Sequence, residues 1–308
     1  DNHLTHMTLK FAVSGNANID IYYFVEKIPQ PDEAVEALEI RTSLGGAATN
    51  IATGISKLGH YARFIGFVGS DPEATEVLSE LKQRGIDVAY VKSSSKQTGR
   101  VIVLLDKEGR RAMIAHRGAN SELRPGAFNP EETLRGIDHL HLSSTSPEYS
   151  YWFFREAKKM GISTSWDPGM TICLRGFKSI KNVLQYVDVL FLNERENEAL
   201  KIDPASIEKP LIIIKKGSEG SEAPQYKIKA EAFRVKALDA TGAGDAFDAA
   251  FLVAWKRKIG LKESLVIANA AGAIKVTRFG AHSSPTASEL AEFLEKNGRE
   301  DLARLFKP

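Results

Sequence analysis

The sequence predicts an α/β fold of three layers, in which helices cover both faces of an open, mostly parallel sheet, with a small extra β-sheet as a lid. Short apolar runs alternate along the 308 residues with longer amphipathic segments, a pattern typical of strand–helix–strand crossover units. The apolar share is 43% and the charged share 26%, which is ordinary for a globular protein, so wholesale disorder and a fibrous repeat are excluded.

The predicted core elements alternate between strand and helix along most of the chain. The predicted strands are 11–13, 62–68, 139–142, 163–166, 187–192, 211–214 and 232–238. The predicted helices are 47–58, 74–84, 151–160, 180–186, 194–200 and 246–255, with a further helical pattern after 285. Parallel strands joined by crossover helices form a sheet that is buried on both faces.

Two stretches interrupt this alternation and predict the lid. The first is strand-like at 21–25 and 36–41 with no helix between, and the second is a hairpin of 99–105 and 110–115 around a turn at 106–109. We therefore expect an α/β core over 7–308 with a lid inserted in it, formed by 20–44 and 97–117. Two uses of the lid stay open: pairing with a second lid in a homodimer, or shielding of a bound ligand.

Composition excludes several classes of protein. The chain has 41 Lys and Arg against 39 Asp and Glu, and a net charge of +2 gives no reason to expect a nucleic-acid partner. Its single cysteine, Cys173, favours a reducing compartment, and we expect the cytoplasm. Apolar runs such as 188–192 are far shorter than the roughly 20 residues that a membrane helix needs. Residues 1–6 are polar and precede Met7, so they are interpreted as a cloning remnant rather than a signal peptide.

Polar residues follow five of the predicted strands at the point where each strand ends. These segments are 14–20, 143–145, 167–169, 193–196 and 215–217. In an open parallel sheet, ligands bind outside the carboxyl ends of the strands, so the five segments together predict one cleft along that edge. Each turn alone also has a structural explanation, because strand-to-helix turns are polar and often begin with a helix cap.

A glycine-rich turn before the predicted helix 246–255 is the strongest local signal. Gly242 and Gly244 flank Ala243, so that several backbone N–H groups can point at one anion such as a phosphate. Asp245 follows directly, although two unit charges 4 Å apart repel by roughly 4 kcal/mol at an effective dielectric of 20. The carboxylate is explained if it takes a proton from an attacking hydroxyl while the N–H groups stabilise a transferred phosphoryl. The alternative is that Asp245 only complements the helix dipole, and the residues alone leave both open.

Competing motifs are incomplete. The nearest match to a P-loop, 54–61, has His60 where the lysine belongs. The turn at Gly242 lacks the third glycine of a dinucleotide fingerprint, because Phe247 occupies that position. The seven histidines are scattered, which argues against a zinc site.

Two longer motifs resemble the signatures of a known family. The segment 239–245, DATGAGD, resembles the C-terminal signature of the ribokinase-like (PfkB-type) carbohydrate and nucleoside kinases, and the segment 44–50, LGGAATN, resembles their N-terminal signature. Shorter motifs at 15–20, 118–120, 193–196 and 216–220 stand in the order of that family. The resemblance extends from residue 9 to about 285.

The resemblance implies phosphoryl transfer from a nucleotide to a hydroxymethyl group of a sugar or nucleoside. The implied donor is ATP with Mg²⁺, with ADP left open, and K⁺ is a further expected ion. Catalytic roles fall on Asp245 as base and on the amides of Gly242, Ala243 and Gly244 as anion hole. The implied sugar-binding residues are Asp20, Gly46 and Asn50, with Gly45 and Gly46 as a hinge and Asn120 beside the sugar. The implied nucleotide site comprises Lys216, Gly217, Gly220 and Asn269, with Asn193 and Glu196 organising Mg²⁺ and phosphates and with Asp239 and Thr241 holding a monovalent cation.

Three functions are weighed. The first is a kinase of an unphosphorylated sugar or nucleoside, and the second is a kinase of an already phosphorylated sugar. The third is a non-catalytic binding protein on the same fold, and it would gain nothing from a carboxylate that faces a phosphate.

If the lid hairpin pairs Arg100 near Ala115, Arg117 lies at its base, where it either anchors a phosphate on the acceptor or ties the closed lid to the core. Arg111, on the same face but at the far end, is expected to face water.

Overall fold

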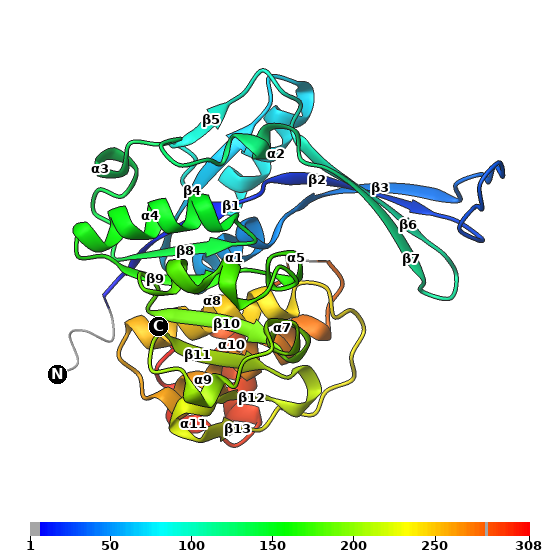
Figure 1. Cartoon of the computed structure of the whole chain (residues 1–308). Coiled ribbons are helices and arrows are strands. Elements are labelled where there is room, and N and C mark those ends of the chain that lie inside the picture. Colours follow the sequence, from blue (N-terminus) through cyan, green and yellow to red (C-terminus); the bar gives the residue numbers. More distant parts are fainter. Residues whose placement is uncertain (1–6, 281–282) are drawn as a thin grey trace.

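A nine-stranded sheet organises the chain in the computed structural model (Figure 1). The structure describes residues 7–280 and 283–308, so the interpretation of 1–6 as a remnant concerns residues outside it. The strand order is β13-β12-β11-β10-β9-β8-β1-β4-β5, parallel throughout except for β12 and β13 at one edge. The strands are β1 (Lys10–Gly15), β4 (Tyr61–Val68), β5 (Val91–Ser93), β8 (His139–Ser143), β9 (Ser163–Asp167), β10 (Val189–Asn193), β11 (Leu211–Lys215), β12 (Ser221–Ala223) and β13 (Ile228–Ala230).

Helices cover both faces of this sheet, which confirms the predicted three layers. One face packs against α1 (Ala47–Lys57), α2 (Pro72–Gln83), α8 (Ala243–Lys256), α9 (Leu261–Val276), α10 (Ala287–Lys296) and α11 (Glu300–Ala303). The other packs against α3 (Pro130–Thr133), α4 (Pro147–Lys159), α5 (Met170–Cys173), α6 (Lys181–Leu184) and α7 (Glu194–Leu200). Of the helices in the described parts of the chain, none is both long and apolar enough to span a bilayer.

The strands are apolar at consecutive positions because alternate side chains enter two different cores. In β10, Phe191 packs in the core of α8 and α9, whereas Leu190 and Leu192 pack in the core of α4. The six predicted strands from 11–13 to 211–214 are confirmed.

The predicted strand 232–238 is wrong. The chain leaves the sheet after β13 and runs as an irregular, mostly exposed segment without strand pairing, with the ring of Phe233 packed edge-on to Phe293. Alternating apolar residues there cover a cavity instead of extending the sheet. Helix α9 was not predicted, because it is buried nearly all round and therefore shows no amphipathic period.

The predicted lid strands are confirmed as a separate four-stranded sheet that projects from the core (Figure 1). It comprises β2 (Asn18–Phe24), β3 (Glu39–Gly45), β6 (Gly99–Leu105) and β7 (Arg111–His116), in the order β3-β2-β6-β7. Arg100 pairs with His116, one residue from the predicted Ala115.

The register gives this sheet two different faces, because residues directly opposite each other point the same way. The rows of one face, which we call the cleft face, are Ser43–Asp20–Val101–Ala115, Arg41–Tyr22–Val103–Met113 and Glu39–Phe24–Leu105–Arg111. The rows of the other, the outer face, are Leu44–Ile19–Arg100–His116 at the base, Thr42–Ile21–Ile102–Ile114 and Ile40–Tyr23–Leu104–Ala112. The cleft face carries most of the charged residues, and the outer face is mostly apolar beyond Arg100 and His116 at its base.

Candidate active site

Three of the predicted strand ends lie next to one another in the sheet. Asp167, Asn193 and Lys215 are the last residues of β9, β10 and β11, which are parallel neighbours. Asn193 pairs directly with Lys215. The carboxyl edge of the sheet therefore gathers these polar side chains at the place where α8 begins, as the sequence predicts.

The glycine-rich turn forms the first turn of α8. Gly242 is the N-cap residue, with φ 78°, and α8 starts at Ala243. The N–H of Ala243 is bonded to the carbonyl of Ala240 at 3.1 Å, so its predicted part in the anion hole is not supported. The N–H groups of Gly242 and Gly244 have no such backbone acceptor among the described residues, and two of the three predicted amides stay available for an anion.

Asp245 and Asn50 are brought together by the packing of α8 against α1. The Nδ2 of Asn50 donates to Oδ2 of Asp245 at 3.0 Å, while the buried Oδ1 of Asn50 accepts no hydrogen bond. Burial raises the pKa of Asp245 to about 7, although the bond from Asn50 acts in the opposite direction. A carboxyl with a pKa near neutrality is well suited to general-base chemistry, and the free amide oxygen beside it can accept a ligand hydroxyl.

The hinge glycines lie where the lid meets the core. A Cβ on Gly45 would lie 2.2 Å from Oδ2 of Asp20, and a Cβ on Gly46 would lie 2.3 Å from the carbonyl oxygen of Asn16. Gly46 also has φ 107°, which disfavours any other residue. Asp20 is on the cleft face, and burial raises its pKa to about 6. The carboxylate can therefore approach the backbone before α1 only because residue 45 has no side chain.

Asn120 is in the predicted place, but its amide is engaged within the protein. Its Oδ1 accepts the N–H of Ala17 at 3.0 Å, and its Nδ2 donates to Oδ1 of Asn18 at 2.8 Å and to the carbonyl of Ala17 at 3.3 Å. Asn120 therefore anchors the connection between β1 and β2, and both amide hydrogens are used in doing so.

The guanidinium groups of the two lid arginines contact different parts of the chain. Arg117 is exposed, and its guanidinium donates to the main-chain carbonyl of Asn120 at 3.3 Å. Arg111, although exposed, does not simply face water: its Nη2 lies 3.4 Å from Oγ1 of Thr241, in the loop that leads into the glycine-rich turn. Spacing along the hairpin indicated the shared face but not the reach of the side chain.

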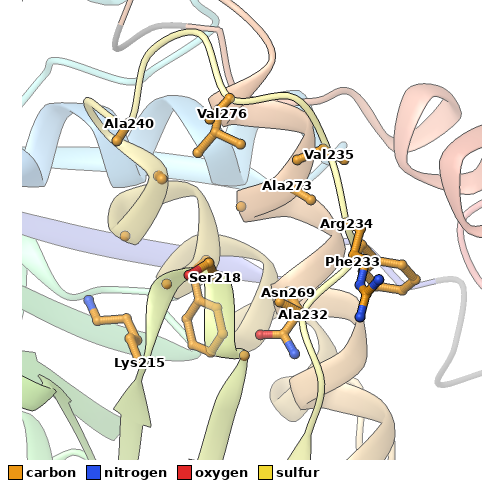
Figure 2. Close-up of a pocket in the computed structure, with 17 residues that line it drawn as sticks. Lys215, Ser218, Ala232, Phe233, Arg234, Val235, Ala240, Asn269, Ala273 and Val276 are labelled. Carbon is orange, nitrogen blue, oxygen red and sulfur yellow. The ribbon is translucent and has the colours of Figure 1, made fainter.

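A cavity of about 490 Å³ lies on the other side of the glycine-rich turn. In Figure 2 the segment from Ala232 to Ala240 arches over it, with Lys215 and Ser218 on one side and Asn269 near its centre. Its lining includes Lys215, Gly217, Ser218, Gly220, Phe233, Val235, Ala243, Gly244, Phe247, Asn269 and Val276. The lining is mostly apolar and opens toward the free amides, which suits a flat heterocycle followed by phosphates.

Two predicted nucleotide residues have structural partners. Lys216 is not part of the lining and pairs with Glu222 at 3.1 Å. Asn269 accepts from Ser221 at 2.9 Å and donates to the carbonyls of Ala230 and Glu231 at 3.1 Å each. Asn269 therefore holds the chain that forms the cavity wall, whereas Gly217 and Gly220 line the cavity directly.

Asn193 and Glu196 form a capping box at the start of α7. The Oδ1 of Asn193 accepts the N–H of Glu196 at 2.7 Å, and Oε1 of Glu196 accepts the N–H of Asn193 at 2.9 Å. Burial and the charge of Asp167 raise the pKa of Glu196. Over 7–280 and 283–308, no three acidic, histidine or cysteine side chains are grouped to hold a metal. The residues fit a Mg²⁺ that phosphates and water also bind, near Glu196.

Asp239 and Thr241 are engaged by their own loop. The Oδ1 of Asp239 accepts the N–H of Thr241 at 2.9 Å, and Oδ2 accepts the N–H of Gly280 at 3.3 Å. Burial alone would raise the pKa of Asp239, but these bonds hold it below its usual value. Because the guanidinium of Arg111 lies at Thr241, the geometry does not favour a monovalent cation there.

The sequence prediction missed a buried cluster beneath the glycine-rich turn. The Nζ of Lys215 lies 2.7 Å from Oδ2 of Asp167 and 3.0 Å from Oδ1 of Asp248, which is fully buried. Asp248 stands three residues after Asp245 in a helix of small and apolar residues. A carboxylate on the buried side of such a helix is a signal that could have indicated a partner.

Comparison with known proteins gives consistent matches. The model of the pfkB family carbohydrate kinases matches residues 8–288. The ATP-dependent ribose-1-phosphate kinase of Halopiger xanaduensis is 33% identical over 291 residues, which cover 92% of this chain and 97% of that protein. The nucleoside kinase of Methanocaldococcus jannaschii is 28% identical over 302 residues, which cover 94% of this chain and 97% of that protein.

Solved structures agree with these matches. The ribokinase of Thermotoga maritima superposes with a TM-score of 0.82 at 30% identity, covering 93% of this chain and 99% of that one. The nucleoside kinase of Methanocaldococcus jannaschii superposes with a TM-score of 0.80 at 27% identity, covering 93% and 98%. The predicted resemblance and the predicted fold are confirmed.

Proposed function

Because the chain belongs to the pfkB family of carbohydrate kinases and is a phosphotransferase with an alcohol group as acceptor, we propose that Asp245 is the base that activates the acceptor. The observation that carries this proposal is the position of Asp245. Its carboxyl lies in the first turn of α8, beside the free N–H groups of Gly242 and Gly244, and is hydrogen-bonded by Asn50.

The proposed transfer is a single displacement at phosphorus. The carboxylate of Asp245 takes the proton of the acceptor hydroxymethyl group, whose oxygen forms a bond to the terminal phosphorus. The bond from that phosphorus to its bridging oxygen breaks, and the electron pair leaves with the nucleoside diphosphate. The N–H groups of Gly242 and Gly244 stabilise the charge on the transferred group, while Asn50 and Asp20 orient the acceptor hydroxyls.

The donor is ATP bound in the 490 Å³ cavity, with its phosphates at the glycine-rich turn. Mg²⁺ near Glu196 neutralises phosphate charge when it is bound, and Asn193 keeps the Glu196 side chain oriented toward that place. ADP as donor is tested in the same assay, with ADP in place of ATP and AMP as the product measured.

A coupled assay of nucleotide turnover tests the proposal. The panel contains ribose, fructose, adenosine, cytidine, ribose 1-phosphate and fructose 6-phosphate, each with ATP and Mg²⁺. Turnover with at least one acceptor and its loss by 100-fold or more in Asp245→Asn, about 3 kcal/mol in the barrier, supports the proposal. Acceptor and nucleotide binding without turnover in the wild type would favour the non-catalytic alternative.

A second candidate, a kinase of an already phosphorylated sugar, is favoured by Arg111. Arg41, Arg100 and Arg110 of the lid are each paired with a carboxylate. In the described part of the chain Arg111 has no carboxylate partner, and its guanidinium points across the cleft to Thr241. A relative of this chain is an ATP-dependent ribose-1-phosphate kinase. An unpaired arginine on the cleft face is suited to a phosphate that the acceptor already carries.

We further propose that the outer face of the lid pairs with a second copy of the chain. Ile40 and Ile114 on that face are 56% and 64% exposed, and Ile21 and Ile102 lie in the same row as Ile114. Replacing K⁺ by Na⁺ in the turnover assay tests the remaining expectation, a monovalent cation at Asp239 and Thr241. An unchanged rate would agree with Arg111 as the cation at that loop.

A further inference from the structure

The cluster beneath the glycine-rich turn joins three elements far apart in the sequence. Asp167 ends β9, Lys215 ends β11, and Asp248 lies in α8. The Nζ of Lys215 is 2.7 Å from Asp167, in hydrogen-bonding geometry. It is 3.0 Å from Asp248, at ion-pair distance but outside hydrogen-bonding geometry. The side chains of Asp167 and Lys215 are 14% exposed and that of Asp248 is fully buried, so this is not a solvated surface pair.

The amine of Lys215 faces the place where a phosphate would lie. It belongs to the lining of the cavity, together with Gly217 and Gly244. A Cβ added to Gly244 would meet no other group within 4 Å than this Nζ, at 3.4 Å. The first turn of α8 and the amine therefore border the same space, and in Figure 2 Lys215 lies at the edge of the cavity on that side.

The two carboxyls differ in their state. Burial raises the pKa of Asp248 well above its usual value, and the charge of Asp167 acts in the same direction. Burial would also raise the pKa of Asp167, but the charge of Lys215, which also donates a hydrogen bond to it, holds it below its usual value. Asp248 is therefore the carboxyl that is harder to ionise, and Asp167 is the one that is stabilised in its charged form by the lysine. An amine that is paired in this way can be buried and still present an N–H group to an incoming anion.

We propose that Lys215 contacts the terminal phosphate of the nucleotide, and that Asp167 and Asp248 are positioning residues that fix its amine below the glycine-rich turn. The inference rests on the proposed function for the identity of the donor. In this arrangement Asp248 acts on the phosphate only through Lys215.

Nucleotide binding tests this inference without any acceptor and without Asp245. The dissociation constants of ATP, ADP and AMP are measured by calorimetry, in the presence of Mg²⁺, for the wild type and each variant. Lys215→Met is expected to raise the dissociation constant of ATP at least tenfold and that of AMP less than threefold, because only the terminal phosphate loses its partner. Lys215→Arg keeps the charge and is expected to recover at least part of the affinity for ATP.

Two substitutions of Asp248 separate positioning from packing. Asp248→Asn keeps the shape and a hydrogen-bonding group beside the amine, and is expected to bind ATP within threefold of the wild type. Asp248→Leu removes the hydrogen-bonding group and is expected to weaken the binding of ATP but not that of AMP. Lys158→Met is the matched control, because Lys158 pairs with Asp188 away from the cavity lining. It is expected to change neither affinity.

Two results would overturn the inference. In the first, Lys215→Met binds ATP as the wild type does, which would make the cluster purely structural. In the second, the binding of ATP and the binding of AMP are weakened equally in both Lys215→Met and Lys215→Arg, which would indicate a disturbed cavity. The expected losses of ATP affinity in these variants, together with no turnover of any acceptor by the wild type, would instead count against the proposed function alone.

Discussion

The glycine-rich turn and the lid border the same cleft, but they hold their polar groups in different ways. At the turn, the half-buried Asp245 and the buried Asp248 lie on one helix and are held by Asn50 and Lys215. On the lid, the charged side chains project from a thin sheet with one polar and one apolar face, and Arg111 reaches the core through one long contact. Fixed groups suit the chemical step, which tolerates little displacement. Groups on a projecting sheet suit recognition of the acceptor and contact with a second chain.

The largest expected effect is the loss of turnover when the glycine-rich turn is changed. Gly244→Val places a branched side chain against the amine of Lys215 and over the free amides. We expect turnover to fall at least 1,000-fold while the circular dichroism spectrum stays native. The measurement is steady-state turnover with the best acceptor of the panel. Activity within tenfold of the wild type would mean that no phosphate lies at this turn.

The next effect separates acceptor classes at the lid. Arg111→Ala removes a charge-assisted contact that contributes about 1.5–3 kcal/mol, so KM for a phosphorylated acceptor is expected to rise roughly 10- to 100-fold. KM for ribose and nucleosides is expected to change less than threefold. Arg110→Ala is the control, since Arg110 pairs with Asp106 and Glu108 at the hairpin turn. An equal rise of KM for all acceptors would indicate that Arg111 holds the lid against the core and does not contact a phosphate.

The next smaller effect concerns the outer face of the lid, where a substitution is expected to halve the mass of the protein particle in solution. Ile114→Asp places a charge on the edge strand of this apolar face and is expected to convert a dimer into a monomer, as measured by light scattering after gel filtration. Met113→Asp is the matched control, because Met113 is equally exposed but lies on the cleft face. A wild-type chain that is monomeric at all concentrations would exclude pairing through the lid.

The smallest effect concerns the core beneath the site. His139 and His141 are fully buried, and hydrogen bonds of 2.7 Å to Ser163, Ser165 and Ser143 occupy both ring nitrogens of each. Burial lowers the pKa of His141 to about 3, so below pH 6.5 the unfolded chain takes up a proton that the folded one does not. Stability is therefore lost as pH falls from 6.5. Between pH 7.5 and pH 5, chemical unfolding of His141→Gln should show about 2 kcal/mol less loss than the wild type. An identical loss of stability in both proteins would show that His141 does not contribute to the pH dependence of unfolding.

Much of the fold could be predicted because its signals are local. The strands 62–68 and 139–142 and the turn at Gly242 are each specified by adjacent residues, and the structure has them. The segment 232–238 has the same kind of pattern, yet it remains irregular, because pairing depends on an edge that no local pattern reveals.

The site was predicted less completely, because side-chain partners come from the tertiary fold. Asn120 and Asn269 stand in matching motifs, but their amides hold the backbone. Lys215 was predicted only as part of a polar strand end and Asp248 was overlooked, because their ion pair exists only in the tertiary fold. Arg111 and Arg117 share a face by spacing, and only the direction of each side chain tells which of them reaches the core.

The pH dependence of kcat/KM in the wild type and in Asp245→Asn tests the central claim most directly. Since burial raises the pKa of Asp245 to about 7, the wild-type rate is expected to rise with pH through about 7 as the carboxyl loses its proton. In Asp245→Asn the rate should be at least 100-fold lower and should lack this limb. The same limb in both proteins, or a variant within tenfold of the wild type, would contradict Asp245 as the base.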